Sequence, residues 1–342
     1  MARILLLALA ALLAATTATS ATCTNPSVRK PWTALTEDEK ASYINSTLCL
    51  MDPSQAPAKV GSWGATSRWE ELVVAHIAQV RYIHTVGALF PWHRWYTKIH
   101  EDLLRNECGY TGPYPYWDQQ TDQSLYLIQN ASVWDTASTV KAFGTGRTDV
   151  STNCILDGAF TDYRVRFNTQ LERDETGGGG VCLTRALNQT AFDTVSQANV
   201  VEPCMALEKG DDYGEMLGCL GNTPHSGGHL GVGGIMRDHA RSPADPIFYL
   251  HHTNFDRLWW EWQTSSPGRL YAMGGPNVAA NQIIFDAQPK ILPENMFLPY
   301  FGDGGSNVTT LDHILWMPGL AENITIRDTM DVRGDKMCFE YV

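Results

Sequence analysis

Long apolar runs are almost absent from this 342-residue chain, and the one that occurs stands at the N-terminus. The run ILLLALAALLAA follows the basic residue Arg3 and precedes the small residues TTATSAT. It is shorter than the roughly 20 residues of a membrane span, and its three-part pattern is typical of a cleaved secretory signal. We therefore expect a signal peptide over residues 1–20, a secreted mature chain and no span across a membrane.

Basic residues are also scarce: 25 Lys and Arg stand against 37 Asp and Glu, which gives a net charge of −12. A negative surface repels phosphate backbones and anionic lipids, so neither nucleic acid nor a membrane surface is an expected partner. The chain also lacks heptads, tandem repeats and linker-like stretches, and GGGG at 177–180 is its one low-complexity patch. We expect that patch to be a surface loop and residues 21–342 to form a single domain.

Cysteines and glycosylation signals agree with export from the cell. The eight cysteines are an even number, which in an exported chain predicts up to four disulfides, although their pairing cannot be deduced from the sequence. Asn-x-Ser/Thr triplets predict N-glycosylation on the same route. They begin at Asn45, Asn130, Asn188, Asn307 and Asn323.

Helical periodicity with start and stop signals occurs in residues 35–48, 67–84, 91–107, 246–263 and, more weakly, 213–220. Thr36 is a candidate N-cap with acids behind it, and Ser67 precedes Glu70 by three residues. Pro91 and Pro246 suit the first turns of helices. HSGGHLGVGG after residue 224 is expected to be a loop. Together these stretches predict a mainly α fold with a central four-helix bundle, surrounded by long loops and a few short strands.

Six of the ten histidines fall into two groups of three: His76, His84 and His93, then His225, His229 and His252. A lone histidine on a helix is usually a core or surface residue, but neutral imidazole is also a strong ligand for copper and zinc. On one helix, residues eight apart differ by roughly 80° and can lean toward one cavity. The i, i+4 spacing of the pair in HSGGH occurs in many metal sites. In the adjacent pair of the LHH string, residues point about 100° apart, so we expect only one to face a shared site.

The strings that other metals require are missing. HExxH, typical of zinc proteases, does not occur, and neither do the Glu-x-x-His pairs of carboxylate di-iron bundles. Blue copper would need a cysteine that the predicted disulfides already use. Six imidazoles without carboxylate or thiolate suit a dinuclear copper pair with dioxygen bound between the ions. A mononuclear zinc hydrolase built on one group is the alternative.

Four strings carry a resemblance to a known family: PWHRWY, NECGYTGPYPYWD, PHSGGH and SPADPIFYLHHTNFDRLWW. They are similar to the tyrosinase/catechol oxidase family of type-3 copper proteins, in particular its short secreted fungal members, and the likeness runs from about Pro31 to the ending CFEYV. The resemblance implies two copper ions per chain. It implies the ligands His76, His84 and His93 for one ion and His225, His229 and His252 for the other. It also implies that His251 is a neighbour rather than a ligand, and that His100 and His313 are structural or surface residues.

Other residues are expected to support these ligands. The rings of Phe90 and Phe248 should pack against the imidazoles and keep the site dry. Asp256, four residues after the last ligand, should orient a neighbour or pair with Arg257. By the resemblance, His239 stands where the family places a gate residue over the second copper.

Two positions depart from the family pattern. Several members carry a cysteine two residues before the second ligand, joined to its ring by a thioether, and this chain has Tyr82 there, so we expect packing alone to hold His84. Members that hydroxylate monophenols often have Asn after the first ligand of the second copper, with an upstream Glu. Here Ser226 takes that place and the nearest upstream acid is Glu215. A hydroxyl orients a water less well than an amide, and a phenol has a pKa near 10, so oxidation of diphenols is favoured over hydroxylation of monophenols.

The sequence therefore predicts a secreted dicopper polyphenol oxidase, with small phenols and dioxygen as its partners, that oxidises o-diphenols to o-quinones. The alternatives are a tyrosinase with monophenol hydroxylase activity, an oxidase of methoxylated phenols and, more remotely, a hemocyanin-like oxygen carrier. Larger family members have a C-terminal domain that plugs the active site, and the likeness here ends at Val342. We accordingly expect no plug domain and no need for proteolytic activation.

Overall fold

The computed structural model of the protein describes residues 23–134, 142–176, 179–207, 212–293, 296, 300–304 and 307–342. The predicted signal peptide lies outside the described residues, and so do two of the four glycines at 177–180. Within the described residues, no helix combines the length and apolarity that crossing a membrane requires.

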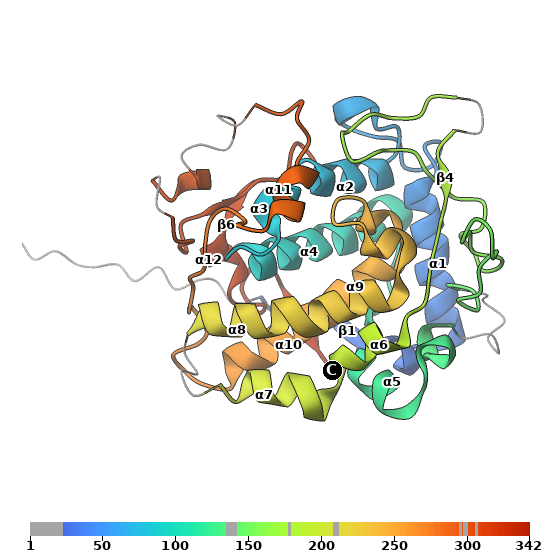
Figure 1. The fold of residues 1–342 in the computed structure, drawn as a ribbon. Coiled ribbons are helices and arrows are strands. Elements are labelled where there is room, and N and C mark those ends of the chain that lie inside the picture. The colour runs from blue at the N-terminus through green and yellow to red at the C-terminus, as the bar shows by residue number, and fades with distance from the viewer. Residues whose placement is uncertain are drawn as a thin grey trace, which may run out of the picture.

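Helices make up most of the regular structure and the strands are few and short, so the mainly α prediction is confirmed (Figure 1). The helices are α1 (Glu37–Met51), α2 (Arg68–Ile77), α3 (Val80–Ile83), α4 (Leu89–Cys108), α5 (Gln119–Leu125), α6 (Gln189–Phe192), α7 (Glu202–Met205), α8 (Tyr213–Leu220), α9 (Ser226–Val232), α10 (Ile247–Thr264), α11 (Gln282–Ala287) and α12 (Ile326–Thr329). The strands are β1 (Ser27–Pro31), β2 (Tyr114–Tyr116), β3 (Arg164–Val165), β4 (Val181–Cys182), β5 (Ile314–Leu315), β6 (Ile324–Thr325) and β7 (Phe339–Tyr341).

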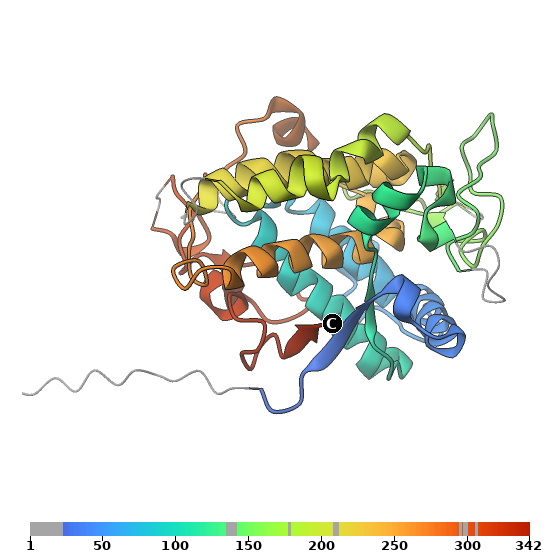
Figure 2. The same ribbon diagram turned by 90° about the horizontal axis from the view of Figure 1, so that it is seen from below.

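The predicted bundle consists of α2, α4, α9 and α10. In Figure 1, α2, α4 and the rod formed by α8 and α9 lie one above another, and Figure 2 shows from below that α10 runs between this rod and α4. Large rings fill the space between these helices: Trp69 of α2, Trp92 of α4 and Trp259 and Trp262 of α10 are all buried. Because nearly every face of α2 and α4 is covered, these helices form a rigid centre around which the loops are arranged.

A small parallel sheet joins the two ends of the described chain. β1 is its middle strand and pairs with β2 on one side and β7 on the other, so that Arg29 faces both Tyr114 and Tyr341 in register. Figure 2 shows β1 beside the C-terminus. The disulfide Cys23–Cys338 connects the same two segments.

The capping signals place the helix ends correctly. Thr36 and Glu39 form a reciprocal capping box at the start of α1. α4 ends at Cys108 and is followed by Gly109 at φ 67°, a left-handed conformation that glycine adopts without strain. α10 begins directly after Pro246.

The predicted single helix over residues 67–84 is wrong, because α2 and α3 are separate helices and His84 follows α3 with extended backbone. The side chain of Gln288 occupies the break. Its amide nitrogen donates to the Ala78 carbonyl at 2.7 Å and its carbonyl oxygen accepts from the Arg81 backbone at 3.1 Å. A residue about 200 positions away thus satisfies the backbone groups that the interrupted helix leaves unpaired.

The predicted loop HSGGHLGVGG is also largely helical. Gly221–His225 form a π-helical turn that joins α8 directly to α9. Pro224 lies inside this turn, where its missing N–H and its ring would disturb a regular α-helix. Such wider turns are frequent at functional sites, and this one carries His225.

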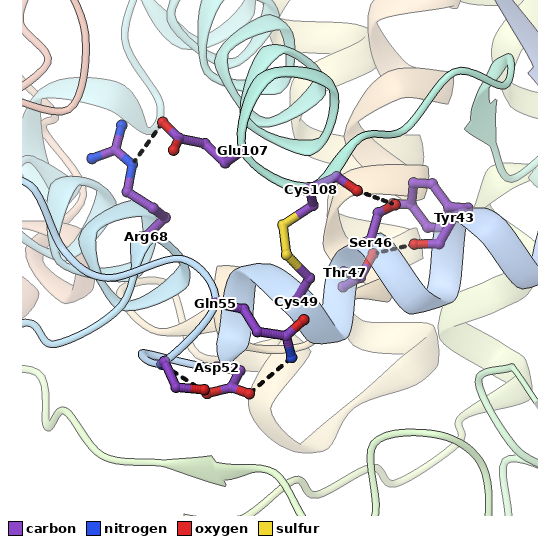
Figure 3. The surroundings of a disulfide bond; sticks show 10 residues. Tyr43, Ser46, Thr47, Cys49, Asp52, Gln55, Arg68, Glu107 and Cys108 are labelled. Carbon is purple, nitrogen blue, oxygen red and sulfur yellow. Dashed lines mark hydrogen bonds and ion pairs between the residues drawn. A yellow bond between two sulfur atoms is a disulfide. The ribbon is translucent and has the colours of Figure 1, made fainter.

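All eight cysteines are paired, which confirms the prediction of up to four disulfides. The pairs are Cys23–Cys338, Cys49–Cys108, Cys154–Cys182 and Cys204–Cys219. Figure 3 shows Cys49–Cys108, which ties the last turn of α1 to the end of α4, with the Ser46 hydroxyl 3.5 Å from the Cys108 carbonyl. The end of a helix that carries a candidate ligand is therefore covalently fixed.

Candidate metal centre

The first cluster consists of His76 from α2, His84 from the segment after α3 and His93 from α4. One ring nitrogen of each lies within 4.8 Å of those of the other two. In each ring Nδ1 donates to a backbone carbonyl 2.7–2.8 Å away, which fixes the tautomer and directs Nε2 to the cluster. The three residues predicted as one set therefore do come together, and His84 is held by a hydrogen bond as well as by packing.

The second cluster consists of His225 from the π-helical turn, His229 from α9 and both His251 and His252 from α10, again with ring nitrogens within 4.8 Å of one another. Nδ1 of His225 and of His229 donates to a backbone carbonyl, at 3.2 and 2.8 Å respectively. Because the rings of His251 and His252 both reach the cluster, the expectation that only one of them would do so is wrong.

The adjacent histidines of α10 face different neighbours. The ring of His252 stacks on His93 with centroids 4.3 Å apart, so it lies between the two clusters. The ring of His251 lies parallel to His225 and donates from Nδ1 to the side-chain oxygen of Gln119 at 2.8 Å. Sequence analysis did not single out Gln119, and its position after the PYWD string was the only available signal.

The donor atoms fit metal ions. Nε2 of His225, Nε2 of His251 and Nδ1 of His252 are buried without any hydrogen-bond partner. Buried polar atoms are rarely left in this state, and a metal ion bound in the second cluster would satisfy Nε2 of His225. Both clusters consist of histidines alone, without a carboxylate or a thiolate, and such an all-imidazole ligand set suits copper.

Burial keeps these imidazoles neutral, which is the form that binds metal. It lowers the pKa of His76 to about 3 and that of His229 to about 4. Burial likewise holds the pKa of His84, His93 and His252 well below the ordinary value. At pH 7 the clusters therefore offer lone pairs instead of positive charges.

Aromatic rings surround the clusters, partly as predicted. Phe248 contacts histidines of both clusters, and its centroid lies 4.1 Å from that of His252 and 5.5 Å from that of His76. Phe90 lies one ring further back. It stacks on Phe255, which in turn stacks on His225. Phe255 is thus a further ring against an imidazole that sequence analysis did not name.

The predicted pairing of Asp256 with Arg257 is wrong. The buried carboxylate of Asp256 pairs with Arg94 and Arg29, and it also accepts a hydrogen bond from Tyr341. Arg257 points away and pairs with Glu261. Asp256 therefore ties α10 to α4 and to the parallel sheet. It lies one turn after His252, and its partner Arg94 directly follows His93.

A cavity of about 400 Å³ reaches one histidine of each cluster, His84 and His225. A smaller one of about 80 Å³ adjoins it over His229. Both cavities are lined by Ser226 and by His239. The exposed side chain of His239 thus lies at the cavities over the clusters, where a gate residue would stand. A larger groove of about 830 Å³ near Trp32 contains no histidine and lies apart from the clusters. The first cavity is lined by His84, Thr85, Leu89, Gly214, Leu217, Gly218, Gly221, Asn222, His225, Ser226, His239, Gly275, Pro276, Asn281 and Ile284.

The remaining predicted residues take varied places. Glu215 is exposed on α8 and does not line either cavity, although its neighbour Gly214 does. Tyr82, at the position of the thioether cysteine, packs its ring against Phe301. His100 is fully buried and stacks on Tyr249, and His313 pairs with Asp303, so both are structural.

Fold and site together define a dinuclear metalloprotein with imidazole ligands on a helical bundle. A model of the common central domain of tyrosinase matches residues 66–265, which spans both clusters, and the chain therefore belongs to the tyrosinase family. Enzymes of this family are copper oxidoreductases that act on small phenols with dioxygen, and the two clusters fit its two copper ions.

Relatives and a solved structure agree. Tyrosinase-like protein phomQ1' of Diaporthe leptostromiformis is 28% identical over 332 residues, which cover 93% of this chain and 80% of the relative. N-acetyl-6-hydroxytryptophan oxidase ivoB of Emericella nidulans is 29% identical and covers 98% of this chain and 99% of its own. A polyphenol oxidase variant from Thermothelomyces thermophila has the same fold, with a TM-score of 0.69, 24% identity and coverage of 93% of this chain and 89% of the other.

Proposed function

We propose that the protein is a secreted oxidase of o-diphenols that forms o-quinones with dioxygen. The observation that carries this choice is the cavity over the two clusters, whose described lining residues include no carboxylate. A monophenol must lose a proton of high pKa before it can bind a metal through oxygen. An o-diphenol offers two oxygens and is more readily oxidised, so a site whose described lining has no carboxylate to take up that proton favours it.

The proposed ligands of one copper ion are His76, His84 and His93, and those of the other are His225, His229 and His252. The pair of ions supplies two-electron transfer between a phenol and dioxygen when bound. The protein fixes the positions of the imidazoles through the Nδ1 hydrogen bonds to backbone carbonyls.

The cavity suits a flat aromatic substrate. Its volume is in the range of small-molecule sites, and its walls include the apolar side chains of Leu217, Pro276 and Ile284. His84 and His225 are buried lining residues, one from each cluster, so a ring that enters between those walls can present its oxygens to both clusters. The buried ring of Phe248 behind the histidines keeps water from the far side.

Ser226 supports diphenol oxidation further. Its hydroxyl lies 3.4 Å from the Gly221 carbonyl within the π-helical turn, to which it donates. It has no amide with which to hold a water as a base, and the nearest upstream acid, Glu215, does not line the cavity. Neither Ser226 nor Glu215 therefore supplies a carboxylate or an amide that could position a water as a base at this site.

Secretion is part of the same proposal. Cleavage near Ser20 would release the mature chain, and the four disulfides suit an oxidising compartment. All five sequon asparagines are exposed, as attachment of a glycan requires: Asn45, Asn130, Asn188, Asn307 and Asn323. Treatment of the exported protein with an N-glycosidase should lower its apparent mass.

The test compares 4-methylcatechol with p-cresol by oxygen uptake on the copper-loaded chain. We expect rapid oxidation of 4-methylcatechol and at least about tenfold slower uptake with p-cresol. The variant His93→Ala should lose both activities because it removes a ligand from one ion. Comparable rates of oxygen uptake with both phenols would show a tyrosinase with monophenol hydroxylase activity. If neither phenol is oxidised, the proposed function is wrong.

A further inference from the structure

A short segment between α9 and α10 bridges the two clusters. The Met236 carbonyl accepts the Nδ1 hydrogen bond of His229, and the Ala240 carbonyl accepts that of His76, each at 2.8 Å. Residues 236–240, the bridging segment, are therefore fixed at both ends by one histidine of each cluster. What this segment presents to the cavity is held in a defined place relative to both metal positions.

The charges on the bridging segment are arranged unequally. Asp238 turns back on its own chain: its carboxylate accepts from the backbones of Ala240 and Arg241 and pairs with the side chain of Arg241. Arg237 instead lines the smaller cavity together with His225, His229 and Ser226. Among the residues that the structure describes, no carboxylate forms an ion pair with the guanidinium of Arg237.

The described residues that line the two adjoining cavities carry no other permanent charge. They are histidines, apolar residues, glycines and neutral polar residues such as Ser226, Asn222 and Asn281, and Arg237 is the one permanent cation among them. The protein as a whole is strongly acidic, at −12, so a cation at this place is not explained by the general composition. It makes the smaller cavity attractive to anions and repulsive to cations.

We propose that Arg237 determines specificity by binding a carboxylate at the end of the substrate's side chain. The inference rests on the proposed function, because it takes the phenol ring to lie in the cavity. A guanidinium is planar and always charged, and its fork of donors matches a carboxylate in two hydrogen bonds. The smaller cavity, which Arg237 lines, shares His84, His225, Ser226 and His239 with the larger one, so a para substituent of a ring bound over the clusters can extend toward Arg237. The preferred substrates are then o-diphenols with a short carboxylated side chain.

Three catechols of similar size and different charge test the proposal. They are 3-(3,4-dihydroxyphenyl)propionate, neutral 4-ethylcatechol and cationic dopamine, and the measured quantity is the ratio of kcat/KM values at low ionic strength. We expect the order anionic, neutral, cationic in the natural protein. Arg237→Gln should lower the anionic-to-neutral ratio by about 3- to 10-fold, and Arg237→Glu should reverse the order of the anion and the amine. Added salt should reduce the ratio in the natural protein more than in Arg237→Gln.

Two controls separate the possible failures. Arg327→Gln removes the same charge from an exposed pair with Asp312 outside both cavities, and it should leave the ratio unchanged. Calorimetric binding of 3-phenylpropionate, which cannot turn over, should weaken by about the same 3- to 10-fold in Arg237→Gln. If 4-ethylcatechol is oxidised but neither the ratio nor this binding changes in Arg237→Gln, the inference on Arg237 is wrong and the proposed function stands. If no catechol is oxidised, the proposed function itself is wrong.

Discussion

Neutralising Asp256 should destabilise the whole bundle. Its carboxylate is 3% exposed, and its partners Arg94 and Arg29 are fully buried. After Asp256→Asn, Arg29 keeps an ion pair with Glu101 at 3.1 Å. Among the described residues, Arg94 then keeps hydrogen bonds to the carbonyls of Thr329 in α12 and of Met330, and contacts with the rings of Trp259 and Trp260. Its buried charge then lacks a counter-charge.

The cost follows from this loss. Removing one partner of a buried ion pair costs about 3–5 kcal/mol. With an unfolding entropy of about 2.1 cal/mol/K per residue over roughly 320 residues, this corresponds to a fall in Tm of about 4–7 °C. Differential scanning calorimetry at one scan rate measures it, since disulfide-bonded proteins often unfold irreversibly.

The matched control is Asp312→Asn, which removes a carboxylate of the same kind from an exposed pair with Arg327. Such pairs contribute little, and the expected change is under about 1 °C. If Asp256→Asn melts within 1 °C of the natural protein, the buried network does not hold α10 against α4 in the way described here.

The remaining predictions concern the clusters and one buried histidine. His252→Ala should lower the copper content, measured by metal analysis, from two ions per chain toward one, whereas His251→Ala should keep both ions. The opposite result would mean that His251 is the ligand and His252 its neighbour. Gly228→Ala should disturb the second cluster, because a Cβ there would lie 2.3 Å from the His251 ring and 2.6 Å from the Gln119 amide, and copper content and Tm should both fall. Gly218→Ala, with nothing within 4 Å of its Cβ, should keep the copper content and should not lower Tm, since alanine is the better helix former within α8. Burial lowers the pKa of His100, so the unfolded chain takes up a proton there below about pH 6.5 and the folded chain does not. The contribution of neutral His100 to the free energy of unfolding is present above pH 6.5 and falls by about 1.4 kcal/mol per pH unit below it. The Tm of His100→Phe should therefore fall less between pH 7.5 and pH 5.5 than the Tm of the natural protein. Equal falls would contradict the assignment of this pH dependence to His100.

Local signals predicted a large part of the fold. Thr36, Gly109 and Pro246 mark helix ends by rules that depend only on nearby residues, and the structure follows them. The two histidine groups were likewise visible as strings, because ligands on helices recur at short spacings. The family resemblance then assigned each group to a metal ion, and the structure brings each group together.

Partners that are distant in sequence caused the errors. Gln288 breaks the helix that the pattern of residues 67–84 predicts, and nothing within those residues reveals it. Asp256 was assigned to its neighbour in sequence, although its partners come from α4 and β1. The contact of Gln119 with His251 and that of the Ala240 carbonyl with His76 are tertiary contacts of the same kind. Periodicity reports one element at a time, whereas these contacts arise between elements.

The π-helical turn was missed for a different reason. Glycines and a proline in GNTPHSGGH disfavour a regular helix, and the sequence pattern therefore predicted a loop. In the structure Gly228 is required by a close neighbour, the His251 ring, and Pro224 is accommodated by the wider turn. Packing around the clusters here overrides the local preference.

Two clusters of buried neutral imidazoles are the binding site for a pair of copper ions. This conclusion can be tested by metal analysis of the full chain after loading with copper and removal of loosely bound ions. We expect two copper ions per chain, and about one in a variant that lacks His93 or His252. A single tightly bound zinc ion, or two copper ions retained after both of these histidines are replaced, would contradict it.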